Sequence, residues 1–552
     1  MNQVWLHHYD AHVKGVLDIP NVTVCDLLKN AAKENPSSIA LIDDSTLITY
    51  AELFDFANRV ARNLNKQGYG YGDRIGVAFT NTPEFVISFF GILHAGAGVA
   101  AINPNLVPRE QIAQMENVNI NGLLADGSVY ENIIASNLSL PETISQVFIT
   151  KKNEAYLNER KVSDAKEKKE CNFVSWEDLL VENSAKDEIV VKPEWPAIYQ
   201  FTGGTTGVPK AAIGLHKNLV ANTYQFKTWC DLDQKNPVIM AAIPLYHVYG
   251  MVLGMNLAVS LMAPLVLIQN PRDVSNLLKN IEKHSVSFLP GVPSLFNSIN
   301  QNSDFTSRKF DLSSLKVCIS GAASLHEHIA RIFLTYAGCN LIQGYGLSEA
   351  PTATHCNPVY GKNKTESIGM PLPGVLCRVV DLESGTVDVS RSQPGELLIK
   401  APQVMAGYYQ NTSETENVLK DGWLHTGDVV TMDEEGYFYF KERKKDLIKV
   451  SGFQVWPHEV ERIIREIYGV KDVAVAGVSL NESGEQAIAW VVLDAMSNLK
   501  ITEIQNQCKK QLASYKIPRE FIEINEIPRN ATGKVLRRVL VDEYLKKKKT
   551  PL

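Results

Sequence analysis

The segment that decides the fold runs from Tyr50 to Gly96 and contains YAELFDFANRVARNLNKQG (50–68), RIGVAF (74–79) and PEFVISFFGILHAG (83–96). The outer two stretches repeat apolar residues at helical spacing, whereas the middle one is a short apolar run typical of a buried strand. Gly68 stands where the first helix would end, and Pro83 stands where the second would begin. This alternation predicts an α/β fold in which mostly parallel sheets are covered by helices.

Length and composition extend this prediction to a multidomain globular protein. The chain has 552 residues, which is too long for a single ordinary core. Hydrophobic residues make up 45% and charged residues 21%, as in soluble proteins. The formal net charge of -6 argues against a nucleic-acid partner and favours small-molecule substrates.

Cysteine usage and the first residues predict the compartment. The 8 cysteines are scattered, with no CxxC pair and no Cys/His cluster at zinc spacing. The stretch MNQVWLHHYDAHVKG lacks the basic start and the apolar core of a secretory signal. Both features predict a cytoplasmic protein with reduced thiols.

One uncharged segment, Met251 to Gln269 (MVLGMNLAVSLMAPLVLIQ), is about long enough to cross a bilayer. Polar residues and Pro264 interrupt it, and its second half, PLVLIQ, is typical of a short buried strand that follows a helix. We therefore interpret the segment as a helix and strand of the core. A membrane-embedded carrier that uses it as a span is the alternative.

The pattern restarts after Val450. A helix that begins at Pro457 (HEVERIIREIYG, 458–469), strands at VAVAGV (473–478) and AIAWVVL (487–493), and a helix over 504–512 predict a small α+β domain. We place the boundary between a large N-terminal domain, 1–444, and a C-terminal domain, 445–552. The charged stretch 150–171 is predicted to be a solvated surface insertion without chemistry.

The stretch with the strongest chemical signal is YQFTGGTTGVPKAAIG (199–214), in which a strand leads into a glycine- and threonine-rich loop. Glycines let backbone N–H groups turn toward an anion, while threonine hydroxyls and a lysine add further donors. The residues concerned are Thr202, Gly203, Gly204, Thr205, Thr206, Gly207 and Lys210. The Walker pattern GxxxxGK[ST] is absent, so the loop predicts a phosphate site outside the standard P-loop fold. Taken alone, it is also compatible with a surface turn.

The order of these residues resembles the phosphate loop of the adenylate-forming superfamily, which includes acyl-CoA synthetases, firefly luciferases and peptide-synthetase adenylation domains. Other motifs that resemble those of the superfamily follow in the expected order: PLYHVYG (244–250), GAA (321–323), QGYGLSE (343–349), GWLHTGDVV (422–430), KERKKDLIKVSGF (441–453) and IPRNATGKVLRR (527–538). The resemblance covers nearly the whole chain and is strongest to bacterial long-chain fatty acid-CoA ligases.

The resemblance implies a nucleotide site. Ribose contacts fall on Asp428 and Arg443, and magnesium contacts on Glu349 and Thr202. Catalytic roles fall on Lys210, Lys534, His247 and Glu349, with His247 beside the carboxylate pocket. The contacts to the rest of the nucleotide fall on Gly321, Ala322, Ala323, Gln343, Gly344, Tyr345, Gly346 and Ser348, in addition to the phosphate loop. Most relatives have threonine in place of Ser348, and glycine or aspartate in place of Glu442.

The resemblance also implies a small, mobile C-terminal domain that carries Lys534. Lys445 matches the position of the hinge, Gly452 the pantetheine tunnel, and Lys449 a residue that enters the site after the domain rotates. Gly250 and Gly254 suggest room for an acyl tunnel with Met251 at its entrance.

The implied activity uses ATP, Mg2+ and coenzyme A to convert a fatty acid into acyl-AMP and then acyl-CoA, with AMP and pyrophosphate as the other products. A long acyl chain is expected. Transfer to an acyl carrier protein, and a medium-chain or aryl acid as substrate, are the alternatives. Peripheral association with the inner membrane face and a homodimer also stay open.

Overall fold

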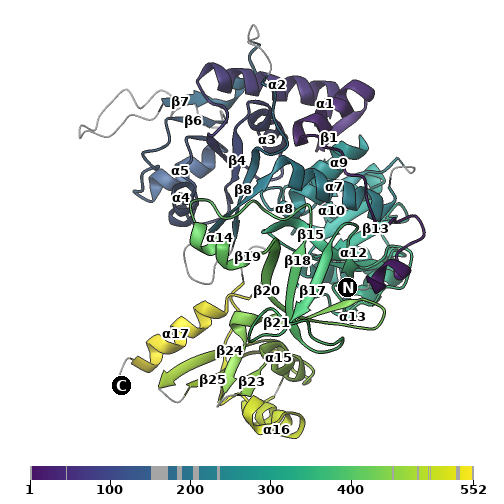
Figure 1. Ribbon diagram of the computed structural model, residues 1–552, viewed down its shortest axis with the longest axis vertical. Helices are drawn as coiled ribbons and strands as arrows, with labels where there is room; N and C mark the ends of the chain where they lie inside the picture. Colours follow the sequence, from purple (N-terminus) through teal and green to yellow (C-terminus); the bar gives the residue numbers. More distant parts are fainter. Residues whose placement is uncertain are drawn as a thin grey trace.

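The computed structural model describes residues 3–44, 46–150, 172–182, 189–202, 210–232, 236–450, 453–481, 484–494, 497, 499–529 and 535–549. Its strands form two large sheets, a smaller antiparallel sheet and a separate group near the C-terminus (Figure 1). The predicted α/β fold, with a large helix-covered part and a smaller C-terminal part, is confirmed.

The first large sheet has the strand order β7-β6-β5-β3-β4-β8-β9 and is parallel except for the pair β8–β9. Its strands are β3 (Arg74–Ala78), β4 (Gly98–Ala101), β5 (Gly122–Ala125), β6 (Gln146–Ile149), β7 (Asn172–Ser175), β8 (Pro196–Thr202) and β9 (Lys210–Leu215). Helices α2 (Tyr50–Lys66) and α3 (Pro83–His94) flank β3 in sequence, so the elements predicted from residues 50–96 are confirmed.

The second large sheet has the order β16-β15-β14-β13-β12-β10-β11-β1-β2 and is parallel from β14 to β1. Its strands are β1 (Ile39–Asp43), β2 (Thr46–Thr49), β10 (Ile239–Ala241), β11 (Leu265–Leu267), β12 (Phe288–Gly291), β13 (Val317–Ser320), β14 (Leu341–Leu347), β15 (Ala350–Cys356) and β16 (Met370–Pro371). The N-terminal strand β1 therefore lies beside β11, far from it in sequence.

Helices and sheets alternate in layers because successive strand residues point to opposite faces. On β13, Val317 and Ile319 join the core shared with the first sheet, whereas Cys318 joins the core on the outer face. Between the two sheets lie α2, α3, α1 (Val24–Glu34), α7 (His216–Cys230) and α9 (Leu257–Leu261). The outer layers are α4 (Pro108–Asn117) and α5 (Gly127–Ala135) on one side, and α10 (Val274–His284), α11 (Pro293–Gln301), α12 (Ser303–Thr306) and α13 (Glu327–Ala337) on the other.

A smaller antiparallel sheet follows, built from β17 (Leu376–Val380), β18 (Gly395–Lys400), β19 (Leu419–Lys420), β20 (Trp423–Met432) and β21 (Phe438–Arg443), with α14 (Thr412–Val418) beside it. Beyond it, β22 (Ile448–Val450) pairs with β23 (Phe453–Val455), and β24 (Val470–Asn481), β25 (Gly484–Leu493) and β26 (Glu520–Glu523) form a further sheet. Helices α15 (Pro457–Arg465), α16 (Ile501–Gln511) and α17 (Arg537–Lys549) complete this part.

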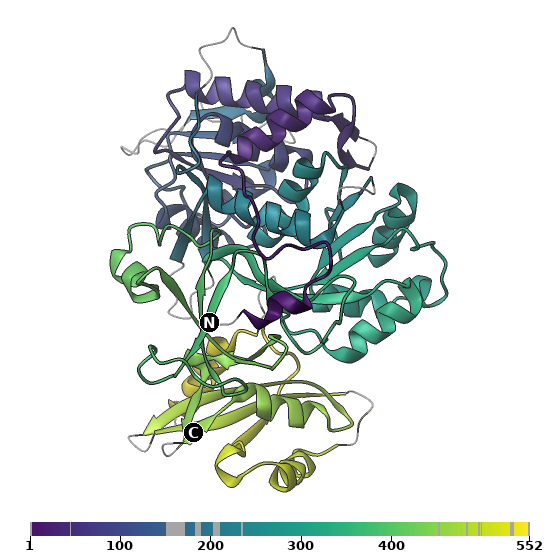
Figure 2. The same cartoon turned by 45° about the vertical axis from the view of Figure 1, so that its right-hand side comes forward.

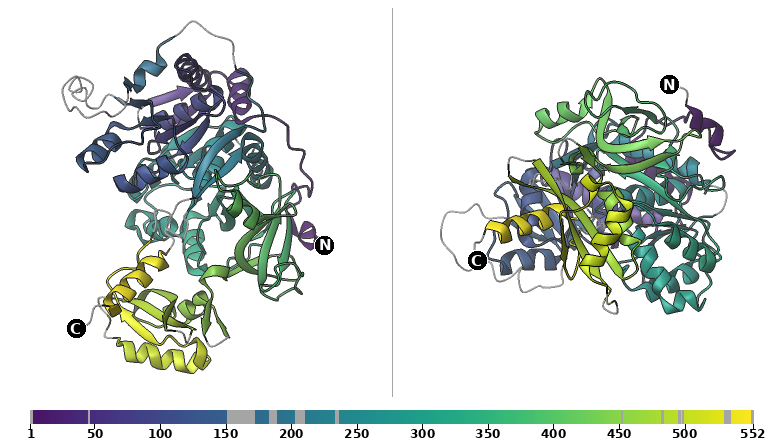
Figure 3. Two further views of the ribbon diagram at one scale, coloured as in Figure 1. Left: turned by 60° about the vertical axis from the view of Figure 1, so that its left-hand side comes forward. Right: turned by 90° about the horizontal axis from the view of Figure 1, so that it is seen from below.

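The residues from 448 onward build cores of their own, and they lie below the large sheets in the left view of Figure 3. The strands and helices predicted for this part are confirmed, although α15 ends at Arg465 rather than Gly469. The helix cannot extend to Gly469, because this glycine adopts a φ of 94°, which a helix does not permit. The boundary at 444/445 stays a prediction.

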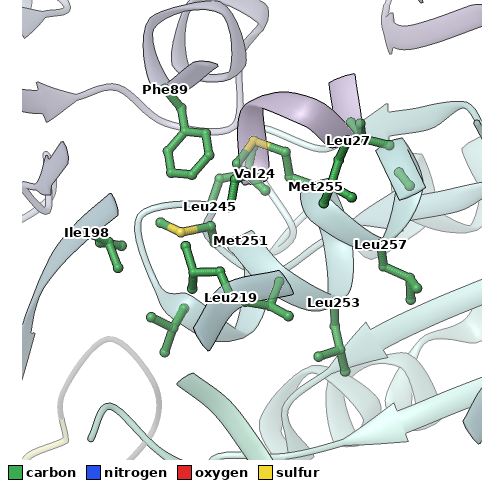
Figure 4. Packing of buried hydrophobic residues seen from close by; sticks show 14 of the residues in the cluster. Val24, Leu27, Phe89, Ile198, Leu219, Leu245, Met251, Leu253, Met255 and Leu257 are labelled. Carbon is green, nitrogen blue, oxygen red and sulfur yellow. The ribbon is translucent and has the colours of Figure 1, made fainter. Parts of the chain in front are cut away.

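The apolar segment from Met251 is buried inside the large part of the protein. It forms a π-helix, Met251–Asn256, then α9 and β11. Figure 4 shows Met251, Met255 and Leu257 packed among side chains of α1, α3 and α7. The predicted helix and strand are confirmed. Among the described residues, no helix has the length and apolar character that a membrane crossing requires.

The N-terminal segment, residues 4–13, packs far from the strand β1 that follows it. Trp5 lies edge-on to Phe438, and Asp10 accepts hydrogen bonds from the backbone N–H groups of Val359 and Tyr360, at 2.8 and 3.1 Å. Figure 2 shows this segment in purple beside the green strands of the smaller sheet. The segment thus ties the start of the chain to residues 359–438.

Candidate active site

A cleft of about 1030 Å³ brings most of the predicted motifs together. It lies where β8, β9, β13 and β14 meet the segment after β21 and residues 535–541. The carboxyl ends of parallel strands commonly form the binding crevice of an α/β sheet. The predicted residues that line the cleft are Thr202, Lys210, His247, Gly321, Ala322, Gly344, Tyr345, Gly346, Ser348, Glu349, Arg443 and Lys445.

Lys210 begins β9 at the edge of this cleft and carries a positive charge into it. Its Nζ forms an ion pair with the carboxylate of Glu414 on α14, and lies 5.5 Å from the ring centroid of Tyr408. The Lys210 side chain is 24% exposed and that of Glu414 is 38% exposed, so both can be reached from the cleft. An anionic ligand would therefore compete with Glu414 for Lys210.

Glu349 follows β14 and is half-buried at the cleft wall. Its Oε1 accepts a hydrogen bond of 2.7 Å from the hydroxyl of Tyr408, and its backbone carbonyl accepts one of 2.9 Å from the N–H of Met405. Burial, followed by the adjacent Glu349, raises the pKa of Tyr408 and keeps its phenol protonated as a donor. The carboxylate, with the hydroxyls of Thr202 and Ser348 on the same cleft, offers the hard oxygen ligands that Mg2+ prefers.

Gly346 is required by the packing of the protein's own strands. A Cβ at this position would lie 1.7 Å from the backbone carbonyl oxygen of Thr352, on β15. The glycine is thus required by the close approach of two strands of the protein, in addition to any approach of a nucleotide base. At Gly344 the nearest atom, the His355 carbonyl oxygen, would be 3.4 Å away.

Asp428 and Arg443 face each other on the adjacent strands β20 and β21. Asp428 Oδ1 lies 2.6 Å from Arg443 Nε, and Asp428 Oδ2 accepts a hydrogen bond of 2.6 Å from the Tyr345 hydroxyl. Burial opposes the charge of Arg443, but the attraction of Asp428, together with that of Tyr345, Glu349 and Asp446, outweighs it and raises the pKa of Arg443. Arg443 and Tyr345 thus hold the Asp428 carboxylate in place. A sugar hydroxyl that binds Asp428 would share this carboxylate with Tyr345.

His247 lies on the apolar side of the cleft, just before α8 (Val248–Gly250). Burial lowers the pKa of His247 to about 4, so the ring is neutral at pH 7. Its buried Nε2 has no hydrogen-bond partner among the described residues. Next to it, the Tyr249 hydroxyl donates to the Ile319 carbonyl at 2.9 Å. A neutral ring nitrogen beside apolar side chains suits an uncharged or carbonyl-like group of a ligand.

Four predicted residues lie away from the lining of the cleft. Asp428 is buried behind Arg443, and the Oε1 of buried Gln343 accepts a hydrogen bond of 2.6 Å from the Leu325 N–H. Ala323 is exposed just beyond the lining residue Ala322, whose φ of 68° is in the left-handed region. Lys449 is exposed, and its backbone N–H donates to Glu485 at 2.8 Å.

The positions predicted at Gly203, Gly204, Thr205, Thr206, Gly207, Gly452 and Lys534 lie outside the described residues. Sequence reasoning missed Tyr408, Glu414 and Thr426, which all line the cleft. Tyr408 lies in the stretch PQVMAGYYQ (402–410), Glu414 follows that stretch, and Thr426 lies in GWLHTGDVV. GWLHTGDVV is one of the motifs that carry the resemblance, whereas only the fold brings Tyr408 to Glu349 and Glu414 to Lys210.

Comparisons with known proteins define the class. The family model of the AMP-binding enzyme matches residues 28–409, and the model of the AMP-binding enzyme C-terminal domain matches residues 459–534. The first match alone spans more than half of the chain. The chain belongs to the AMP-binding enzymes.

Particular relatives narrow the comparison. The long-chain-fatty-acid–CoA ligase of Bacillus subtilis (strain 168) is 33% identical over 98% of both chains. A probable 4-coumarate–CoA ligase 1 of Dictyostelium discoideum is 33% identical over 95% of this chain and 96% of its own. The crystal structure of ATP-bound MatB from Rhodopseudomonas palustris superposes with a TM-score of 0.83, at 25% identity over 96% of this chain and 100% of that one.

Proposed function

We propose that this chain is an AMP-forming ligase that activates a long-chain fatty acid with ATP and transfers the acyl group to coenzyme A. The observation that carries the proposal is one cleft whose lining combines Lys210, Glu349 and Arg443 with apolar side chains, and in which Arg443 is held by the buried Asp428. The near full-length similarity to long-chain-fatty-acid–CoA ligases supports the choice of substrate.

The first half-reaction brings two anions together, the fatty acid carboxylate and the α-phosphate of ATP. A catalyst must neutralise charge where they meet and hold them in line. In our proposal Lys210 binds the phosphates after leaving Glu414, and Asp428 with Arg443 holds the ribose. Lys534 bridges the carboxylate and the nucleotide. Glu349, Thr202 and Ser348 would hold Mg2+, which supplies further positive charge to the phosphate oxygens when bound.

The acyl chain enters on the side of His247. Phe226, Val248 and Leu253 line the cleft there and offer an apolar surface, at about 0.8 kcal/mol per buried methylene. One of the two glycines expected to leave room for a tunnel, Gly250, is required by the packing of the backbone. A Cβ on Gly250 would lie 2.4 Å from the Pro244 carbonyl oxygen, so its absence serves backbone packing. Met251 is fully buried and is not among the cleft-lining residues, so it does not mark the entrance.

In the second half-reaction the thiol of coenzyme A attacks the carbonyl of the bound acyl-adenylate, and AMP leaves. We assign Lys445 to the hinge at the cleft, Gly452 to the pantetheine passage, and Lys449 to a group that enters the site after the C-terminal part rotates. The exposed position of Lys449 fits a residue that is outside the site in this orientation.

The experiment that tests the function is pyrophosphate release from ATP across a panel of acids, with and without coenzyme A. We expect the fastest release with C12 to C18 acids and acyl-CoA as the final product. Faster turnover of aryl acids would favour the alternative suggested by the Dictyostelium relative, and acyl-AMP that coenzyme A fails to consume would favour a carrier-protein acceptor. No pyrophosphate release with any acid would refute the proposal.

Membrane association and dimerisation are further proposals. The basic helix α17 ends in Lys546 to Lys549, a charge pattern that attracts anionic lipid. We propose peripheral binding through this end at low ionic strength, to be tested by flotation with anionic and neutral vesicles. A homodimer would appear as a doubled mass in light scattering.

A further inference from the structure

One buried carboxylate connects the smaller antiparallel sheet to the C-terminal helices. Glu442 lies on β21 and is 1% exposed. Its Oε2 accepts a hydrogen bond of 3.0 Å from the backbone N–H of His458, in the first turn of α15. The N-cap residue of α15, Trp456, makes no side-chain capping bond. Because a helix N-terminus favours a negative charge, Glu442 caps this helix from a different sheet.

The same carboxylate faces a buried arginine at the start of α17. Arg537 Nη1 lies 3.8 Å from Glu442 Oε1 and 3.8 Å from Asp446 Oδ2, and its Nη2 lies 2.8 Å from Glu461 Oε1. Arg537 Nε also donates to the Val475 carbonyl at 2.9 Å. We refer to Glu442, Asp446, His458, Glu461 and Arg537 as the junction cluster.

The ion pairs of the junction cluster connect the C-terminal part with the smaller antiparallel sheet. Glu461 and Arg537 both belong to the C-terminal part and are joined within it, so they would stay together if that part moved. Glu442 belongs to β21, which pairs with β20 of the smaller sheet. The Phe440 ring, also on β21, lies edge-on to the His458 ring at 5.8 Å. Glu442 is therefore the charged member through which a rotation would break the cluster.

The junction cluster adjoins the cleft, since two of its members, Asp446 and Arg537, line it. Arg443, which pairs with Asp428, directly follows Glu442, and residues 535–539, which line the cleft, include Arg537. Burying a carboxylate is unfavourable unless donors surround it, and separating a buried charge from its partners leaves that cost uncompensated. The cluster thus favours one orientation of α15 and α17 strongly over neighbouring ones.

We propose that Glu442 is a positioning residue that holds α15 and α17 in the orientation required for adenylate formation. It acts through the helix cap at His458 and through Arg537, three positions after Lys534, and it must release both before the acyl group is transferred to coenzyme A. The inference rests on the proposed function, because it assigns Glu442 to one of the two half-reactions.

The test compares Glu442→Ala and Glu442→Gln with a matched control. Glu459→Gln lies on the same helix α15, but its partner Lys516, at 2.7 Å, is also in the C-terminal part. Single-turnover pyrophosphate release without coenzyme A measures the first half-reaction. Acyl-CoA formation from supplied acyl-AMP measures the second.

We expect Glu442→Ala to slow adenylate formation about tenfold or more while acyl transfer changes by less than about twofold, since only the first step needs this orientation. Glu442→Gln retains an oxygen acceptor for the His458 N–H, so it should fold normally and lose less activity. Glu459→Gln should leave both rates unchanged. Equal losses in both half-reactions for the Glu442 variants, or no loss in either, would overturn the inference.

A second readout does not depend on enzymatic activity. Limited trypsin digestion at Lys444 and Lys445 should be several-fold faster in both Glu442 variants than in Glu459→Gln, because the junction beside β21 would open more often. Unchanged digestion would overturn the positioning role. If the unmodified protein released no pyrophosphate with any acid, the proposed function would fail, while the digestion rates would still report on Glu442.

Discussion

Lys210 already has an anionic partner in this structure, because its Nζ forms an ion pair with Glu414 that a phosphate would have to displace under the proposed role. We expect Lys210→Ala to weaken ATP binding about tenfold, because a charged contact of this kind contributes on the order of 1.5 kcal/mol. Glu414→Gln should instead strengthen ATP binding, by up to about fivefold, because a partly exposed ion pair is worth at most about 1 kcal/mol. Calorimetric titration with Mg-ATP measures both, and weaker binding in Glu414→Gln would contradict the competition.

Glu349 is the carboxylate to which we assign magnesium. Glu349→Gln should raise the Mg2+ concentration for half-maximal pyrophosphate release about tenfold, since an amide oxygen is a weaker ligand than a carboxylate. Tyr408→Phe removes one hydrogen bond to Glu349, so the Mg2+ concentration for half-maximal release should change by about threefold. A magnesium titration of the initial rate checks both variants. An unchanged Mg2+ dependence in Glu349→Gln would remove this residue from the metal site.

The residue types of the site could be read from the sequence because the motifs are local, but their partners could not. The segment QGYGLSE identified Tyr345 and Glu349. Nothing in it indicated that Tyr345 binds Asp428 or that Glu349 binds Tyr408, because these contacts join positions 83 and 59 residues apart. Gly346 shows the same limit, since the Thr352 backbone that requires it is brought close only by the pairing of β14 with β15.

At the scale of elements, Gly346→Ala tests how strands β14 and β15 support the site. The added methyl group would overlap the Thr352 carbonyl, so the strands must separate and Tyr345 must shift away from Asp428. We expect ATP binding to be lost and thermal stability to fall. Gly338→Ala, at the end of α13, is a useful control because a Cβ there meets no atom within 4 Å, although its φ of 68° adds strain. Normal ATP binding by Gly346→Ala would contradict the interpretation.

Three buried histidines join elements of the core and predict a dependence of stability on pH. Burial lowers the pKa of His216 and of His355 to about 3 and that of His247 to about 4. Unfolding returns these pKa values toward 6.5, so the unfolded chain binds more protons below that pH. The free energy of unfolding should be fully retained above pH 6.5 and should decrease as the pH falls from 6.5 to about 4.

Chemical denaturation at several pH values between 4 and 7.5 measures this effect. His355→Gln should flatten the pH dependence, whereas His8→Gln, at an exposed position, should not. His216 offers an independent check, because its Nδ1 accepts a hydrogen bond from the Val24 N–H and so connects α7 to the start of α1. An identical slope in His355→Gln and the unmodified protein would contradict the role of burial.

For the whole molecule, the alternation of helical and strand patterns was sufficient to predict layered parallel sheets. The order of strands within the sheets was not predictable, because β1 pairs with β11 through contacts between positions more than 200 residues apart. The apolar segment from Met251 shows why composition alone misleads. The segment carries no charge because it lies between the two large sheets, where side chains of α1, α3 and α7 pack against it.

The two half-reactions give a prediction for the molecule as a whole. We expect Lys534→Ala to abolish adenylate formation, because it removes the cation assigned to the meeting point of carboxylate and phosphate, and to spare most acyl transfer from supplied acyl-AMP. Rapid-quench measurements of the two steps check this. Equal loss of both steps would refute the division of labour between two orientations of the C-terminal part.

The N-terminal segment has a consequence for biosynthesis. Residues 4–13 leave the ribosome before their docking partners, because Val359 and Tyr360 are translated some 350 residues after Asp10, and Phe438 some 430 residues after Trp5. During synthesis the indole of Trp5 must therefore remain undocked until most of the polypeptide has emerged. Nascent chains halted before residue 359 should expose this indole to solvent, and chains released after residue 443 should shield it.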